Sequence, residues 1–144
     1  MRAWTLALLL AGLAGPAWAD GSPLGEWITD GDKARVLIAP CAGQAGRLCG
    51  TITWSYRPPN AGPGPLHDIN NTDASLRSRP IVGLPLLQGF SQDGPEAWSG
   101  GTIYDPEGGK TYKSKLKLTG PDTLQVDGCI LFFCESQVWR RYRG

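Results

Sequence analysis

Apolar and polar residues alternate along most of the chain after residue 25, which is the pattern of strands with one buried face. Within residues 111–119, Leu116 and Leu118 share one face and three lysines share the other. Turn-forming Gly, Pro and Asp residues separate the alternating runs, and no run has sustained helical periodicity. The pattern predicts eight strands, over residues 25–29, 34–40, 48–55, 80–90, 97–105, 111–119, 123–129 and 136–143.

Most connections between these runs have the length of hairpin turns, so the strands form an antiparallel meander. Eight such strands lose their free edges when the sheet closes on itself. We therefore predict an all-β chain that folds as one eight-stranded antiparallel up-and-down β-barrel. A barrel of this size holds either its own side chains or one small ligand.

One connection, Arg57–Pro80, is too long for a hairpin turn. Its first half is rich in Pro and Gly. Its second half predicts a short helix that Thr72 or Asp73 caps and that Pro80 ends. A connection of this length is either a lid or a loop packed by its own side chains.

The first nineteen residues have the pattern of a secretory leader. Arg2 precedes an apolar run at Leu6–Leu13, and Ala17-Trp18-Ala19 is a small-x-small cleavage site. Cleavage after Ala19 leaves residues 20–144 as a single domain. We expect a periplasmic or secreted protein with no lipid anchor and no membrane-spanning segment.

Four cysteines remain after this cleavage, and an oxidising compartment favours disulfides. Local pairing is the simplest arrangement, with Cys41 bonded to Cys49 and Cys129 bonded to Cys134. A zinc site is not expected, because neither pair has C-x-x-C spacing and His67 is the only histidine. We expect no bound metal and no cofactor.

Thirteen basic and thirteen acidic residues remain once Arg2 leaves with the leader. A chain without net charge lacks the basic surface that nucleic acid requires, so no nucleic-acid partner is expected. Lys113, Lys115 and Lys117 alternate along one strand and predict a solvated face.

Catalytic motifs are scarce, since neither G-x-S-x-G nor H-E-x-x-H occurs. A hydrolase that uses Asp68, Asp73 and Asp105 is the least favoured function, because acidic residues in loops more often form turns. We expect that the protein is not an enzyme.

A non-catalytic role, binding a small apolar or amphipathic ligand of lipid-like character, is the leading hypothesis. The candidate lining of the barrel comprises Val36, Ile38, Ile52, Trp54, Tyr112, Leu116 and Leu124. Tyr104 and four polar loop residues are further candidate contacts, namely Asp68, Asn71, Arg77 and Arg79. Two alternatives stay open: the apolar residues simply fill the barrel, and the arginines pair with the aspartates of their own loop. A protein-interaction or envelope-stress module that acts through residues 57–80 is the alternative function.

Gly25 and Trp27 form a G-x-W motif in the first predicted strand, and Trp139 and Arg141 form W-x-R in the last. This arrangement resembles the calycins, which are lipocalin-like barrels. The resemblance implies that Trp27 closes one end of the barrel and that Arg141 or Arg140 packs across its ring.

A longer resemblance covers nearly all of the predicted mature chain. The segments that carry it are "GEW" at 25–27, "LCGTITW" at 48–54, the D-x-x-N-x-D pattern at 68–73, "RSRPIVG" at 77–83, "GGTIYDPEGGKTY" at 100–112 and W-x-R at 139–141. Together they are similar to exported bacterial proteins of the domain of unknown function 2147 family. Such proteins often have proline where this chain has Thr72. The resemblance implies a lipocalin-like barrel and export, and it implies no particular reaction.

Overall fold

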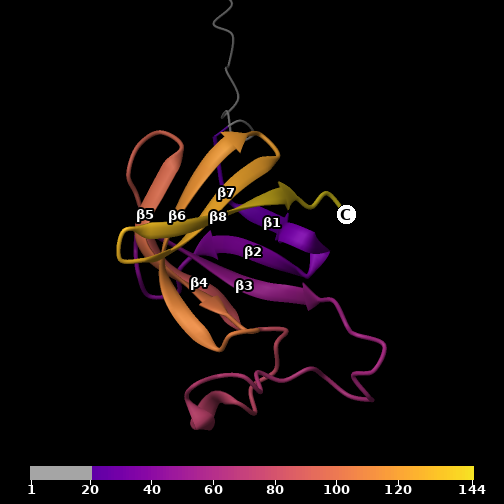
Figure 1. The fold of residues 1–144 in the computed structure, drawn as a ribbon. Helices are drawn as coiled ribbons and strands as arrows, with labels where there is room; N and C mark the ends of the chain where they lie inside the picture. Colours follow the sequence, from indigo (N-terminus) through magenta and orange to yellow (C-terminus); the bar gives the residue numbers. More distant parts are fainter. Residues whose placement is uncertain (1–20) are drawn as a thin grey trace, which may run out of the picture.

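Eight antiparallel strands form a closed barrel in the computed structural model, which describes residues 21–144 (Figure 1). Residues 1–20, with the predicted leader and its cleavage site, lie outside the described residues. The strands are β1 (Gly25–Ile28), β2 (Ala34–Pro40), β3 (Arg47–Ser55), β4 (Pro85–Gln92), β5 (Ala97–Asp105), β6 (Lys110–Gly120), β7 (Thr123–Ile130) and β8 (Phe133–Arg141). Two 3₁₀ turns, η1 (Asp30–Asp32) and η2 (Ala74–Leu76), lie between strands.

Each strand pairs with its neighbours in the sequence, and β1 pairs with β8 to close the barrel. The prediction of an eight-stranded up-and-down barrel is therefore confirmed. The predicted start of the fourth strand at residue 80 was wrong, because β4 begins at Pro85. Residues 81–84 form a turn instead, from which Ile81 and Leu84 pack against the core.

Trp27 closes one end of the barrel. Its ring is fully buried, and its Nε1 donates a hydrogen bond to the carbonyl of Pro23 at 2.8 Å. The guanidinium of Arg141 lies 4.3 Å from the ring centroid and donates to the carbonyls of Leu24 and Ser22, each at 2.8 Å. This stacking confirms the contact that the calycin resemblance implied, and of the two arginines Arg141 makes it.

The other residues of the two motifs, Trp139 and Gly25, also have structural roles. Trp139 precedes Arg141 by two residues on the same face of β8 and is buried, at 1 % exposure. Gly25 has a φ of +117°, and a Cβ atom there would lie 3.1 Å from Nη1 of Arg141. Glycine therefore suits both the backbone conformation and the close approach of the guanidinium.

Inward-facing apolar side chains pack into one cluster that fills the barrel. Five of the seven predicted lining residues belong to it at 2 % exposure or less, namely Val36, Ile38, Ile52, Leu116 and Leu124. The packing is tight, because a Cβ atom on Gly101 would lie only 2.5 Å from the ring of Phe90. Their burial supports the interpretation in which these residues fill the barrel.

The placement of Trp54 on the inner face was wrong. Val36 pairs with Ile52, whereas its neighbour Arg35 pairs with Trp54, so Thr53 is an extra residue in β3. This β-bulge interrupts the period of two and turns Trp54 outward. Its side chain is 39 % exposed, and the guanidinium of Arg35 lies 5.0 Å from the ring centroid.

A second bulge changes the predicted faces of β5, where residues 98, 100, 102 and 104 were expected to share a face. Trp98 pairs with Leu116 and Gly101 pairs with Ser114, so Gly100 is the extra residue. Trp98 and Gly101 consequently share the inner face.

Both predicted disulfides are present, Cys41–Cys49 and Cys129–Cys134. The first bond joins β3 to the residue after β2, and the second lies at the base of the β7–β8 turn. Each bond staples one hairpin, as the local pairing predicted.

Within residues 21–144, no helix has the length and apolar character needed to cross a bilayer.

Candidate functional site

The long connection between β3 and β4 is held to the barrel by a buried carboxylate. The side chain of Asp68 is completely buried. Its Oδ1 accepts a hydrogen bond from the Tyr104 hydroxyl at 2.5 Å, and its Oδ2 accepts from Asn71 Nδ2 at 2.8 Å and from Arg79 Nε at 2.9 Å. Three loop residues and one strand residue therefore share a single anionic centre, which we call the Asp68 cluster.

Burial alone would raise the pKa of Asp68, but the hydrogen bonds from Tyr104, Asn71 and Arg79 outweigh it and hold that pKa below its ordinary value. Burial, with the bond to the carboxylate, raises the pKa of Tyr104 to about 12. At neutral pH the cluster therefore consists of a carboxylate, a neutral phenol and a guanidinium. Because all three donors point at the carboxylate, its role is to fix the loop.

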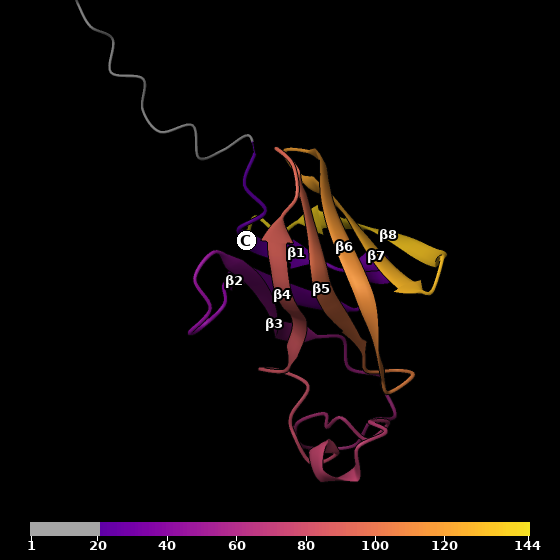
Figure 2. The ribbon, with the colours of Figure 1, turned by 90° about the vertical axis from the view of Figure 1, so that its left-hand side faces the viewer.

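The same part of the loop rests directly on the β5–β6 turn. The backbone N–H of Thr72 donates to the carbonyl of Gly109 at 3.2 Å. A Cβ atom on Gly109 would lie 1.7 Å from the carbonyl oxygen of Asn70, and its φ is +73°. Only glycine permits this contact. Figure 2 shows the loop beneath the ends of β5 and β6.

A short 3₁₀ helix, η2, lies where the short helix was predicted, but it ends at Leu76 rather than at Pro80. Asp73 caps it by accepting a hydrogen bond from the N–H of Ser75 at 3.0 Å, so Asp73 rather than Thr72 is the capping residue. Arg77 Nε donates to the carbonyl of Asn71 at 2.8 Å. Both predicted arginines thus bind their own loop, Arg79 through a carboxylate and Arg77 through a backbone carbonyl.

An open groove of about 760 Å³ lies between this loop and the barrel wall. Loop residues form one side, and the wall and the ends of β6 and β7 form the other. Its lining comprises Asn71, Thr72, Asp73, Leu76, Arg79, Pro85, Gln88, Tyr104, Gly109, Lys110, Thr111, Tyr112, Lys113, Cys129, Ile130 and Leu131.

The register of the sheet places one row of the groove lining on the outer face of the barrel. Directly paired residues in an antiparallel sheet point to the same face. Gln88, Thr102, Lys113 and Cys129 are paired in one row across β4 to β7. Lys113 is exposed and alternates with the buried Ser114, so this row lies on the outer face. Tyr112 instead pairs with Ile103, in the row of the buried Leu87, so it belongs to the inner face. The groove therefore combines residues of both faces and lies beyond the packed core.

The groove combines apolar surface with positive charge. Leu76, Ile130 and Leu131 contribute aliphatic surface beside the two tyrosines. Its charged residues are Lys110, Lys113, Arg79 and Asp73, so cations outnumber anions. This composition suits a ligand with an apolar body and an anionic group.

Four predicted site residues meet at the groove, namely Asn71, Arg79, Tyr104 and Tyr112. Asp68 lies beneath them and bonds to three of them. Leu116 is 2 % exposed in the core, and Trp54 lies on the outer surface beside Arg35. Arg77 does not line the groove.

Groove residues that the sequence interpretation missed include Gln88, Lys110, Lys113, Ile130 and Leu131. Lys113 was assigned to a solvated face, and this face forms part of the groove only because the loop folds over its edge. A sequence signal existed for the two apolar residues, since "CILFFC" at 129–134 places four consecutive apolar side chains in a turn.

The candidate catalytic carboxylates support local backbone structure. Asp73 caps η2, and Asp105 accepts a hydrogen bond from the N–H of Glu107 at 3.0 Å. His67 is exposed and forms an isolated β-bridge with Pro80 at the base of the loop. These contacts explain why the loop carries many polar residues without requiring a reaction.

A solved structure with a similar fold is protein HP1028 from the human pathogen Helicobacter pylori, which is described as belonging to the lipocalin family. The two chains are 18 % identical, with a TM-score of 0.72 over 85 % of this chain and 84 % of that chain. At this identity the similarity shows a shared lipocalin-like fold. No curated protein matches the chain at a significant level.

The family resemblance noted from the motifs is confirmed across the barrel. The sequence profile of the family described as "Uncharacterized protein conserved in bacteria (DUF2147)" matches residues 25–141, from the strand that carries Trp27 to Arg141 above its ring. The chain belongs to the DUF2147 family and folds as a lipocalin-like barrel.

Proposed function

We propose that this protein is an exported, non-catalytic binding protein that holds a small amphipathic ligand with an anionic group in the outer groove. The observation that carries the proposal is the groove itself, whose volume of about 760 Å³ is within the range of small-molecule sites. Its tyrosines and aliphatic side chains suit an apolar body, and Lys110 and Lys113 suit a carboxylate or a phosphate.

This proposal moves the ligand from the interior of the barrel to its wall. The interior is filled by packed side chains, whereas the groove is open and lies beside a loop that the Asp68 cluster holds in place. A fixed loop lowers the entropic cost of binding, because its side chains are already positioned. Export is supported by the two disulfides, which persist in oxidising compartments.

The test uses dodecanoate as a probe in isothermal titration calorimetry. Changing Lys110→Glu together with Lys113→Glu reverses the charge of the groove, and we expect affinity to fall at least about tenfold. Lys117→Glu is the matched control, since Lys117 lies on the same outer face of β6 and does not line the groove. Affinity that survived the double change but fell with Leu116→Ala would place the ligand inside the barrel and contradict the proposal.

A protein-interaction role is the second candidate, and exposed apolar residues near the loop favour it. Ile69 is 71 % exposed and Val82 is 54 % exposed. Ile69→Ser with Val82→Ser should then abolish cross-linking to an envelope partner in cells without changing dodecanoate affinity. Unchanged cross-linking would exclude this surface.

A further inference from the structure

The β7–β8 hairpin end carries the three most exposed large apolar side chains of the described residues, those of Leu131, Phe132 and Phe133. Ile130, Leu131, Phe132 and Phe133 are 60 %, 87 %, 97 % and 81 % exposed. They are consecutive, and Ile130 pairs with Phe133 across the turn. We call these four residues the apolar tip. Two adjacent, almost fully exposed phenylalanines are costly in water, so the tip indicates a contact with an apolar phase.

The tip is built to project as a unit. The Cys129–Cys134 disulfide joins the two strands directly below it. Leu131 has a φ of +53°, which is unusual for a residue with a side chain. The disulfide and the β7–β8 ladder hold this conformation, so the tip keeps its shape without packing against the barrel.

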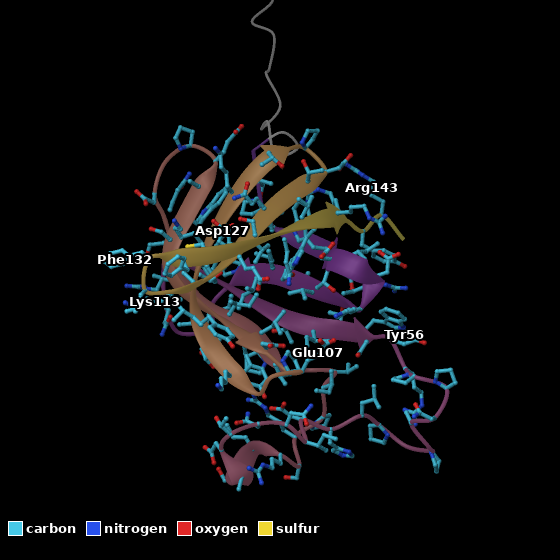
Figure 3. The ribbon with its side chains drawn as sticks, viewed as in Figure 1. Tyr56, Glu107, Lys113, Asp127, Phe132 and Arg143 are labelled. Carbon is cyan, nitrogen blue, oxygen red and sulfur yellow. A yellow bond between two sulfur atoms is a disulfide. The ribbon has the colours of Figure 1, made fainter. Side chains whose placement is uncertain are left out.

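Positive charge lies one row behind the tip on the outer face. Lys113 pairs with Cys129, and Figure 3 shows Lys113 and Phe132 at the same edge of the molecule. Lys110 and Lys113 line the groove together with Ile130 and Leu131. Glu135 is the nearest acidic residue in sequence, and it pairs with Gly128 on the opposite face of the hairpin. Asp127 lies further along the hairpin and accepts a hydrogen bond from Ser136 at 2.6 Å.

The spacing of these features fits a lipid bilayer. The Ile130–Phe133 pair lies one residue beyond the row of Lys113 and Cys129, and Leu131 and Phe132 form the turn beyond that pair, so the tip extends about two residue steps, roughly 7 Å, past Lys113. The headgroup region on each side of a bilayer is about 5–7 Å thick. When Phe132 enters the edge of the hydrocarbon, Lys113 therefore lies at the level of the phosphates, and its flexible side chain can extend toward them.

We propose that the apolar tip docks the protein on the surface of a bilayer that contains anionic phospholipid. Phe132 and Phe133 enter the interface, and Lys110 and Lys113 contact the phosphates. A narrow, convex turn has little flat area to offer a protein partner or a second copy, whereas it can enter a fluid interface without a matching shape. The charge behind the tip is complementary to anionic headgroups.

The test measures co-sedimentation with phosphatidylcholine vesicles that do or do not contain phosphatidylglycerol. Phe132→Ser with Phe133→Ser should lower partitioning onto the anionic vesicles at least roughly tenfold, because each substitution takes away a large apolar side chain that would enter the interface. Val138→Ser is the matched control, since Val138 is also apolar and 55 % exposed on β8 but lies away from the tip. All variants keep the same N-terminus, so that segment contributes equally to each measurement.

Charge is tested separately with Lys113→Gln, for which we expect several-fold weaker binding to the anionic vesicles, with Lys117→Gln as the control. Wild-type protein that bound neither kind of vesicle, or a double serine variant that bound as well as wild type, would overturn the proposal. So would a dimer in sedimentation velocity that the serine variant lacks, because the tip would then be a self-association surface.

Phe132 and Phe133 do not line the groove, so dodecanoate affinity should be unchanged in the double variant. Dodecanoate affinity therefore tests the groove proposal, and vesicle binding tests the membrane proposal, so either one can fail without the other.

Discussion

At the scale of single residues, Asp68 has the strongest effect on the candidate site. One buried carboxylate accepts hydrogen bonds from three side chains, and in the described chain no buried side-chain polar atom lacks a partner. Removing one member of such a set leaves charges or donors unpaired in a place that water does not reach. The cost is therefore larger than the value of one hydrogen bond.

The cluster predicts an acid-sensitive contribution to stability. The pKa of Asp68 is lower in the folded protein than in the unfolded chain, so the unfolded chain binds the proton more readily. Its contribution is present above the unfolded pKa of about 4 and is lost as the pH falls through the lower folded value. Urea unfolding as a function of pH should show this loss. Asp68→Asn should cost roughly 3–5 kcal/mol at neutral pH and weaken the acid dependence. An acid dependence identical to that of wild type would show that other carboxylates cause it.

At the scale of elements, the sequence predicts strands well and their faces less well. Period two correctly places Leu116 and Leu118 opposite the lysines of β6. It fails at Trp54 and at Trp98–Tyr104, because each β-bulge adds one residue and reverses the faces beyond it. A glycine such as Gly100 suggests a bulge, but Thr53 carries no such signal, so the orientation of Trp54 could not be derived from its neighbours.

Docking of the loop on the β5–β6 turn is an element-scale contact that one substitution can test. Gly109→Ala should separate the loop from the turn, because its Cβ atom would overlap the carbonyl of Asn70. Gly43→Ala is a matched control, since Gly43 has the same φ of +73° and no heavy atom within 4 Å of its Cβ position. We expect faster proteolysis within residues 57–80 only for Gly109→Ala, together with a lower melting temperature than that of the control. Equal proteolysis of both variants would show that backbone strain alone explains the effect.

At the scale of the whole molecule, the barrel closes through its shortest strand pairing, the seam between β1 and β8. β1 and β8 form two residue pairs, Trp27 with Arg141 and Ile28 with Arg140, whereas β6 and β7 form seven. The candidate groove also exists only in the whole fold, because it brings residues 71–79 together with residues 109–113 and 129–131. No local pattern relates these segments, which is why the sequence identified several of the groove residues without predicting that they lie together.

This difference between seams predicts a gradient in hydrogen exchange. The amide of Tyr142, which donates to the carbonyl of Glu26 at 2.8 Å, should exchange at a lower free energy of opening than the amide of Leu116 in the centre of β6. Amide exchange followed by NMR gives both values. Equal opening free energies at the two positions would show that the barrel opens only by global unfolding.

The plug at Trp27 sets a limit on proteolytic trimming of the N-terminus. The carbonyls of Ser22, Pro23 and Leu24 accept the hydrogen bonds of the Arg141 guanidinium and the Trp27 indole. Cleavage after Ala19 would retain all three acceptors, whereas an aminopeptidase that trimmed the chain through Leu24 would remove every one of them. In most domains such trimming is harmless. Here it would leave the buried indole N–H without its acceptor and would leave the Arg141 guanidinium only the carbonyl of Pro121 and the carboxylate of Asp122. The residues just before β1 are therefore part of the structure that closes this end of the barrel.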